Sequence, residues 1–321
     1  MQLNTVGFIG LGNMGSALAQ HAIKSNFQVV GYNRTAQKTD QLKQTGFTPT
    51  YSLNDFITAL KPPRLIWLML SVGLPIDTIL FGPNQLNKAK KTSGQSPENL
   101  LKLLTAGDIV IDGANSHYQH TQDRAIKLKQ QGIHYLDCGT SGGIAGAKLG
   151  ASLMIGGDSK AYKLAEPLFK TLAAPNGYGY FGASGSGHFV KMVHNGIEYD
   201  MMQAIAEVCA ILNTSPLKPD LALATKVWDN GSIIKSNLVK WLNQALTNDA
   251  NLSKTQATIG SLGTGKWTVE TALSLGVPAP VIASAVFARY QTRPEADFGK
   301  KIVQALREHF GGHNSQERDA T

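Results

Sequence analysis

The residues best suited to chemistry lie together on one predicted helix, within the segment 187–199. A helix turns about 100° per residue, so this segment places five polar side chains within an arc of about 140°. They are Lys191, His194, Asn195, Glu198 and Tyr199. Lys191 and Glu198 lie about 10 Å apart along the helix axis, and their long side chains could reach different carbons of one small substrate. A base and an acid placed in this way suit a reaction with two proton-transfer stages.

The same helix has an apolar side, which carries Val190, Val193 and Ile197. We expect these three side chains to pack against other parts of the protein. The polar side then takes part in chemistry only if it faces a cleft. A polar side that faces water is the simpler alternative, and periodicity alone favours it.

A glycine-rich turn near the start of the chain has the spacing G-x-G-x-x-G, in the residues Gly10, Leu11, Gly12, Asn13, Met14 and Gly15. It follows a predicted strand at 6–9 and opens a predicted helix at 13–24, which is the context in which this spacing binds a dinucleotide. Gly10 permits the tight turn, Gly12 lets a pyrophosphate approach the backbone, and Gly15 allows close packing of helix on strand. Free N–H groups at the helix N-terminus bind phosphate. We assign these six residues to a cofactor site; a glycine-rich turn without a ligand is the alternative.

The end of a second predicted strand, at 27–32, indicates which dinucleotide is bound. Asn33, Arg34 and Thr35 follow it, where an NAD site would carry an acidic residue. A guanidinium pairs well with phosphate, which a carboxylate would repel. We therefore expect these three residues to bind the cofactor and NADP to be preferred, with NAD as the alternative. Arg34 would be the main partner of the 2′-phosphate unless it is only a solvated loop residue, and Lys38 would assist it.

The elements that carry these residues alternate between strand and helix. Apolar runs predict further strands at 64–70, 108–111 and 133–137, and a helix at 119–131. Such alternation gives a parallel sheet with helices on both faces, doubly wound because the crossovers are right-handed. Residues at or after the ends of two of these strands are also expected to line the cofactor site: Met69, Leu70, Ser71 and Asn115.

From about residue 187 helical patterns dominate, after the Gly/Ser-rich segment 182–187. The fold class is therefore α/β, with a Rossmann dinucleotide-binding domain at 1–183 followed by an all-helical domain at 184–321 that binds substrate and dimerises. The active site is expected between the two domains. A turn-rich, lysine-rich stretch at 82–100 is interpreted as a surface excursion.

Composition narrows the class of protein further. At about 150 residues per domain, 321 residues suit two domains. No apolar run approaches the roughly 20 residues that cross a bilayer, so no membrane contact is expected. The net charge of +8 is equally compatible with nucleic acid and with small anionic ligands, and ordinary surface charge is a further alternative. Because the basic residues are scattered and no basic stretch is interleaved with aromatic residues, no nucleic acid partner is expected. Two cysteines and the absence of a signal-peptide pattern suit a cytoplasmic protein, and the histidine spacing predicts no metal site.

These motifs together resemble the decarboxylating 6-phosphogluconate dehydrogenases, in the form of their short members. The run 187–199 closely resembles the signature of that family, and His194 to Tyr199 separates it from related β-hydroxyacid dehydrogenases. Further matching stretches lie at 10–15, 112–118, 137–143, 263–268 and 287–290. The resemblance spans nearly the whole chain.

The resemblance implies oxidation of 6-phospho-D-gluconate and loss of CO₂, giving ribulose 5-phosphate without a metal. Lys191 would be the general base at the C3 hydroxyl and Glu198 would protonate C1. Because Lys191 must start neutral, we expect its pKa to be lowered by burial or by nearby cations. The sugar hydroxyls and carboxylate would be held by Asn115, Ser141, Gly142, Gly143, His194 and Asn195. The phosphate would be bound by Tyr199, Lys266 and Arg289, and His313 and Arg318 are candidates for reaching the partner subunit's site.

A homodimer or a dimer of dimers is implied as well, with a role in gluconate use and the pentose phosphate pathway. The chain departs from the short members at Arg34, which looks like the long NADP-using form, and at Ala114, where a glycine is usual. One alternative is an NAD(P)-dependent β-hydroxyacid dehydrogenase that acts on an unphosphorylated acid. The other is a cofactor-sensing protein that has lost its chemistry. Three residues, Lys266, Arg289 and Tyr199, argue against the first alternative. The pair formed by Lys191 and Glu198 argues against the second.

The run 260–266 also satisfies the P-loop spacing G-x-x-x-x-G-K. A P-loop needs Ser or Thr at the next position to bind Mg²⁺, and Trp267 stands there. We reject nucleotide hydrolysis and keep Lys266 as an anion ligand.

Overall fold

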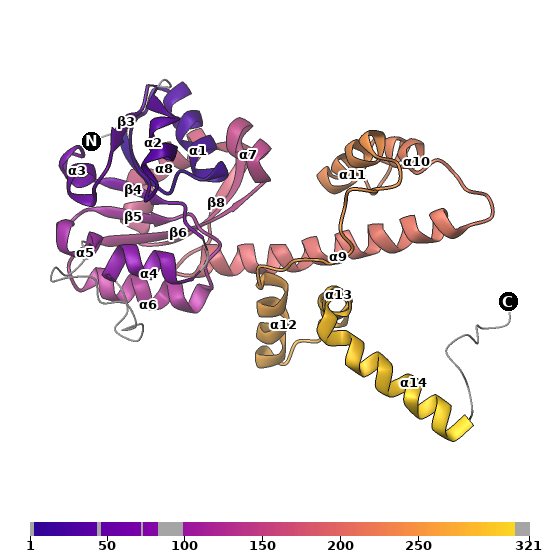
Figure 1. The fold of residues 1–321 in the computed structure, drawn as a ribbon. Coiled ribbons are helices and arrows are strands. Elements are labelled where there is room, and N and C mark those ends of the chain that lie inside the picture. The colour runs from indigo at the N-terminus through magenta and orange to yellow at the C-terminus, as the bar shows by residue number, and fades with distance from the viewer. Residues whose placement is uncertain (1–2, 44–45, 72, 83–98, 312–321) are drawn as a thin grey trace. The chain divides into compact units, whose positions relative to one another are not determined.

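The computed structural model describes residues 3–43, 46–71, 73–82 and 99–311 (Figure 1). The chain divides into two compact units, residues 1–192 and 193–321. The first unit is an α/β layer structure, and the second is built from helices. Within the described ranges, no helix is both long and apolar enough to span a bilayer.

The first unit is built on an eight-stranded sheet with the order β3-β2-β1-β4-β5-β6-β7-β8. Its strands are β1 (Thr5–Ile9), β2 (Gln28–Tyr32), β3 (Thr48–Thr50), β4 (Leu65–Leu68), β5 (Ile109–Asp112), β6 (His134–Ser141), β7 (Ala151–Gly157) and β8 (Ala173–Tyr180). All neighbours pair in parallel except β6 and β7, which are antiparallel. The first six strands have the order that places a dinucleotide at the carboxyl edge of a doubly wound sheet.

Alternate residues of the central strands face two separate cores. Leu65 and Trp67 of β4 belong to one core, and Ile66 and Leu68 belong to the other. Such unbroken apolar runs are typical of parallel strands covered on both faces. In Figure 1, α1 and α8 lie along one face of the sheet, and α4 and α6 lie along the other. The helices of this unit are α1 (Asn13–Lys24), α2 (Ala36–Asp40), α3 (Leu53–Thr58), α4 (Leu74–Phe81), α5 (Leu100–Leu103), α6 (Tyr118–Lys129), α7 (Gly143–Leu149) and α8 (Ser159–Leu172).

The sheet confirms the predicted fold class and adds three strands that the sequence did not indicate. β3 is three residues long, and a proline lies at its centre. β8 reads AAPNGYGY, in which Pro175 and two glycines resemble a turn. β7 runs antiparallel to β6, so it breaks the parallel order that the alternation of strands and helices predicts. Of the predicted surface excursion, residues 83–98 lie outside the described residues.

Helix α9 (Ser186–Thr214) begins in the first unit and ends in the second. The other regular elements in the described part of the second unit are all helical. These are α10 (Leu221–Trp228), α11 (Asn237–Asn248), α12 (Thr264–Leu275), α13 (Pro280–Gln291), the 3₁₀ turn η3 (Pro294–Ala296) and α14 (Asp297–Gly311). α10 packs on α11, where Asn243 Nδ2 donates to the Ala222 carbonyl at 2.6 Å.

The apolar side of α9 is less covered than the sequence predicts. Val190 and Val193 are half-buried, but the Ile197 side chain is 55% exposed. The expectation that all three residues pack against the rest of the chain is therefore wrong at Ile197. Periodicity identifies an apolar face, but it does not say whether the same chain supplies enough surface to cover it.

Candidate active site

The glycine-rich turn packs tightly at two of its glycines and is open at the third. A Cβ at Gly10, where φ is +94°, would overlap the Met69 carbonyl, and a Cβ at Gly15 would overlap the Gly10 carbonyl. At Gly12 a Cβ would have no atom within 4 Å. Gly12 is also the N-cap of α1, and no side chain caps that helix start. The turn thus leaves open space beside an N-terminus of α1 that has no side-chain cap, which is what a dinucleotide phosphate requires.

Asn33 supports this turn from the end of β2. Its side-chain oxygen accepts from Leu11 N at 3.0 Å, and its Nδ2 donates to the Thr35 carbonyl at 3.1 Å. The Asn33 amide is therefore used to hold the turn. Arg34 and Thr35 follow it at the same edge of the sheet, and both are exposed. Their position suits contact with the ribose end of a dinucleotide.

The chain after β4 lies beside the same turn. Met69 N donates to the Ile9 carbonyl at 2.8 Å, which continues the pairing of β1 and β4 by one residue. A Cβ added at Gly10 would lie nearest to the Met69 carbonyl and the Leu70 side chain. Ser71 is exposed. The structure thus places Met69 and Leu70 next to the predicted cofactor site.

The turn after β5 is folded around one carboxylate. Asp112 is fully buried, and it accepts hydrogen bonds from Ala114 N at 3.1 Å and from Ser116 Oγ at 2.9 Å. Asn115 lies between these two donors and is half-buried. Ala114 is itself buried, so the departure from the family's usual glycine is accommodated by the core.

The loop after β6 needs its glycines for a different reason. Ser141 is the last residue of β6, and Gly142 is the N-cap of α7 with φ of +111°. Gly143 also has a positive φ, +61°. Two successive residues in the left-handed region turn the chain sharply into α7, and residues with a Cβ rarely adopt it.

Lys191 is buried in the first unit, where its side chain is packed against β6. The residue is 8% exposed, and a Cβ at Gly139 would overlap the Lys191 Cβ and lie 2.8 Å from its Cγ. The start of α9 is fixed by buried Asp137, whose carboxylate accepts from Gly185 N and from His188 N, each at 2.8 Å. The base of the Lys191 side chain therefore has a position determined by packing and by helix capping.

Within the second unit, Tyr199 and Arg289 lie together. The Arg289 guanidinium carbon lies 3.7 Å from the centre of the Tyr199 ring, and Arg289 Nη1 donates to the Gly260 carbonyl at 3.2 Å. The Tyr199 hydroxyl is 3.0 Å from Ser261 Oγ. Among the described residues, Lys266 makes no hydrogen bond with Tyr199 or Arg289. Its Nζ instead pairs with Glu270 at 3.3 Å on the exposed face of α12.

His194 and Asn195 form a second small group in that unit. His194 Nδ1 lies 3.1 Å from Asn195 Oδ1, and Asn195 Nδ2 donates to Thr264 Oγ1 at 3.4 Å. Glu198 is half-buried on the same helix as Lys191. The predicted tail residues His313 and Arg318 lie outside the described residues.

Sequence reasoning missed several residues that organise these groups. Ser261 and Thr264 lie in the run with P-loop spacing, from which only Lys266 was singled out. The run does not follow a strand in the described part of the chain, and it opens α12 through Gly263 in the left-handed conformation. Asp137 and Gly139 lie in the stretch 137–143 that resembles the family, but their contacts with α9 join residues about fifty positions apart. A single sequence contains no signal for such pairs.

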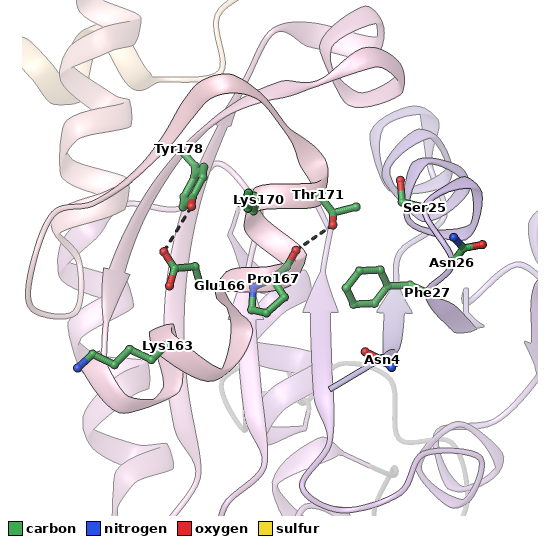
Figure 2. A pocket seen from close by; sticks show the side chains of 10 residues that line it. All are labelled: Asn4, Ser25, Asn26, Phe27, Lys163, Glu166, Pro167, Lys170, Thr171 and Tyr178. Carbon is green, nitrogen blue, oxygen red and sulfur yellow. Dashed lines mark hydrogen bonds between the residues drawn. The ribbon is translucent and has the colours of Figure 1, made fainter. Parts of the chain in front are cut away.

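A separate cavity of about 800 Å³ opens in the first unit (Figure 2). Asn4 and Phe27 line it at the amino ends of β1 and β2, opposite to the glycine-rich turn. On its other side, Tyr178 donates to Glu166 Oε1 at 3.4 Å. Burial, followed by the charge of Glu166, raises the pKa of the neighbouring Tyr162 to about 12. The cavity contains none of the predicted site residues.

The Rossmann-type sheet with its open glycine turn, followed by a helical unit, defines the class of dinucleotide-dependent dehydrogenases. A family model described as the NAD binding domain of 6-phosphogluconate dehydrogenase matches residues 5–185. A second model, the 6-phosphogluconate dehydrogenase C-terminal domain, matches residues 187–297. The chain belongs to the 6-phosphogluconate dehydrogenase family, and it is an oxidoreductase.

Three relatives illustrate the match. The chain is 42% identical over 313 residues to YqeC of Bacillus subtilis (strain 168), whose own assignment as a 6-phosphogluconate dehydrogenase is provisional, with 98% of this chain and 99% of that protein covered. It is 35% identical over 316 residues to an NAD(+)-dependent, decarboxylating 6-phosphogluconate dehydrogenase of Haloferax volcanii, with the same coverage. The Plasmodium falciparum 6-phosphogluconate dehydrogenase, solved in apo form, with NADP+ and with 6-phosphogluconate, has a TM-score of 0.78 at 30% identity and covers 99% of this chain. This chain covers 67% of that longer one.

Proposed function

We propose that the protein oxidises and decarboxylates 6-phospho-D-gluconate to D-ribulose 5-phosphate and CO₂, with NADP as the preferred cofactor and NAD as the alternative. The observation that carries this proposal is α9, which holds a buried lysine near its start and a half-buried glutamate seven residues later. The membership of the family supports the substrate and the reaction.

Lys191 is the general base in this proposal. In its neutral form, the buried amine would take the proton from the C3 hydroxyl. A bound dinucleotide would take up the hydride that leaves C3. The protonated lysine then hydrogen-bonds the C3 oxygen while the β-keto acid loses its carboxylate as CO₂. The electron pair from the broken C1–C2 bond forms the C=C bond of an enediol, and Lys191 returns its proton to the C3 oxygen.

Glu198 is the general acid for the last step. It gives a proton to C1, which was C2 of the sugar acid, while Lys191 takes the proton from the adjacent enediol hydroxyl, and the enediol becomes ribulose 5-phosphate. Because both groups lie on one continuous helix, about 10 Å apart along its axis, they can serve neighbouring carbons through long side chains. The remaining contacts to the sugar hydroxyls and carboxylate are assigned to Asn115, Ser141, Gly142, Gly143, His194 and Asn195.

The phosphate is assigned to Tyr199, Arg289 and Lys266. Arg289 lies over Tyr199 with a guanidinium that can form a bidentate contact to phosphate. The ion pair of Lys266 with Glu270 is more than half exposed on both sides and is therefore weak, so it costs little to exchange for a phosphate. Ser261, beside the Tyr199 hydroxyl, is a further donor for the same phosphate.

The preference for NADP rests on Arg34. Its exposed guanidinium follows β2 at the place where the ribose 2′-position is recognised, and the next acid in sequence is Asp40. The relatives differ in this respect: the Haloferax enzyme is named as NAD(+)-dependent, and the Plasmodium enzyme was solved with NADP+. The residues of this chain favour the phosphorylated cofactor.

The protein is further proposed to form a homodimer or a dimer of dimers. Large apolar side chains are exposed along the second unit, among them Ile197, Ile211, Leu273 and Phe287. Many such side chains on one part of a chain are typical of a surface that another subunit covers. Light scattering after gel filtration tests this, and a monomer at micromolar concentration would contradict it.

A turnover assay tests the proposed reaction directly. We expect the purified protein to release CO₂ and reduce NADP with 6-phosphogluconate, and to do neither with unphosphorylated gluconate at the same concentration. Lys191→Ala should abolish both products while leaving dinucleotide binding intact. Turnover by that variant at the wild-type rate would refute the assignment of the base.

A further inference from the structure

A buried arginine at the carboxyl edge of the sheet joins α4 to the turn after β5 in the first unit. Arg124, on α6, is 2% exposed. Its Nε and Nη2 donate to the two carboxylate oxygens of Asp77, at 2.8 and 2.9 Å. Its Nη1 donates to Ser116 Oγ at 3.0 Å and to Asp112 Oδ2 at 3.3 Å. All three guanidinium nitrogens are therefore engaged, and the partners come from two different parts of the chain.

The first partner fixes the chain that leaves β4. Asp77 lies in the first turn of α4, the helix that follows Met69 and Leu70. The Met69 carbonyl in turn lies against Gly10, in the predicted cofactor turn. A bidentate pair between Arg124 and Asp77 therefore limits movement of the segment that is expected to contact the dinucleotide.

The second partner fixes the turn after β5. Asp112 accepts from Tyr135 OH at 2.8 Å, in addition to Ala114 N and Ser116 Oγ. Arg124 supplies the only positive charge that contacts this buried carboxylate within the described residues. The turn contains Asn115, which is expected to contact both cofactor and substrate.

We propose that Arg124 is a positioning residue that holds the segment after β4 and the turn after β5 at a fixed spacing. This spacing would set the position of the bound cofactor relative to the bound substrate. The proposal rests on the proposed function for the identity of the ligands. A lysine cannot replace this arginine, because its single ammonium cannot form a fork with Asp77 and reach Asp112 and Ser116 as well.

The opposite edge of the same two strands provides a matched comparison. Arg64 immediately precedes β4, Asp108 immediately precedes β5, and Arg64 Nη1 lies 2.8 Å from Asp108 Oδ2. This pair is also mostly buried, with side-chain exposures of 11% and 0%. It fastens the same strands at their amino ends, far from every predicted ligand contact. Loss of either pair should weaken the fold, but only loss of the Arg124 pair should weaken ligand binding.

Three variants separate positioning from stability: Arg124→Lys, Asp77→Asn and the control Arg64→Lys. Thermal melting, calorimetric Kd values for NADP and for NAD, and KM and kcat with 6-phosphogluconate are measured for each variant. We expect Arg124→Lys to raise both the dinucleotide Kd and the 6-phosphogluconate KM about tenfold, the cost of losing charged hydrogen bonds. Asp77→Asn should raise the dinucleotide Kd alone, because the contacts of Arg124 with Asp112 and Ser116 remain. Arg64→Lys should lower the melting temperature and change no binding constant by more than about twofold.

Equal Kd and KM values in Arg124→Lys and Arg64→Lys at matched melting temperatures would overturn the proposal. If Arg124→Lys does not fold, Asp77→Asn decides, since Asp77 is partly exposed and its replacement keeps the shape; an unchanged dinucleotide Kd in that variant overturns the proposal. A wild-type protein that binds dinucleotide but does not turn over 6-phosphogluconate would refute the proposed function. The comparison of dinucleotide Kd values would still decide the role of Arg124.

Discussion

Gly139 offers a direct test of how Lys191 is positioned. The two residues touch where β6 passes α9, and the absence of a side chain at Gly139 leaves the space that the Lys191 stem occupies. In Gly139→Ala, the new methyl group would overlap the Lys191 Cβ, lie 2.8 Å from its Cγ and lie 3.1 Å from the Gly187 carbonyl. Because α9 is held there by Asp137, the helix cannot yield freely, and the lysine stem must move.

The size of the effect follows from two costs. Forcing one methyl group into a packed site destabilises a protein by about 1–3 kcal/mol. Displacing a catalytic group by about 1 Å costs on the order of 100-fold in rate. We therefore expect kcat for 6-phosphogluconate to fall about 100-fold in Gly139→Ala, with the dinucleotide Kd unchanged. Stopped-flow measurement of dinucleotide reduction and calorimetric binding provide the two readouts.

Gly7→Ala is the matched control. Gly7 lies in β1, and its new methyl group would overlap the Phe56 ring and approach Leu60 in the core, away from every predicted site residue. It should lower the melting temperature in the same way and leave kcat within about twofold. If the two variants lose equal stability and both retain wild-type kcat, the space at Gly139 does not position Lys191 and the reasoning fails.

Three further results are expected. Arg34→Asp should reverse the preference from NADP to NAD, because a carboxylate repels the 2′-phosphate and accepts from ribose hydroxyls, and the ratio of kcat/KM for the two cofactors measures this; an unchanged ratio would remove Arg34 from the site. Arg289→Lys should raise the KM for 6-phosphogluconate about tenfold through loss of the bidentate contact, and unphosphorylated analogues should be indifferent to it in competition assays. Desolvation raises the pKa of Asp77, but hydrogen bonds and charge from Arg124 lower it by more, so its pKa in the folded state lies below its ordinary value. This stabilisation is present above the unfolded pKa of about 4 and is lost as the pH falls through the folded value, so wild type and Asp77→Asn should differ in urea stability at pH 7 and converge toward pH 2.

The contacts around the start of α9 explain how a long helix can hold a predicted catalytic side chain in a fixed position. Asp137 accepts two backbone N–H groups at the helix start, and His188 Nδ1 lies 2.7 Å from Thr121 Oγ1 on α6. These anchors come from β6 and α6, whose residues also hold the turn that contains Asn115. In the first unit, the predicted base and the predicted ligand loops are therefore attached to one buried polar layer at the carboxyl edge of the sheet.

The sequence alone determined the local features of this protein. The spacing of Gly10, Gly12 and Gly15 predicts the cofactor turn because each glycine meets a local steric demand, and the structure shows tight packing at the first and third and open space at the second. Apolar runs predict the parallel strands, since a strand buried on both faces must be apolar throughout. Helical periodicity places Lys191 and Glu198 on one stripe, because that geometry depends only on residues within two turns of each other.

Only the tertiary structure decided which distant residues support those features. The pairing of Asp77 with Arg124, the fit of Gly139 to Lys191 and the contact of Ser261 with Tyr199 each join residues about fifty positions apart or more. The hydrophobic pattern likewise did not predict the antiparallel direction of β7 or the exposure of Ile197. The physical reason is that hydrophobic periodicity and turn chemistry depend on residues a few positions apart. The role of a buried charge or a missing Cβ depends instead on the residues that the complete fold places next to it.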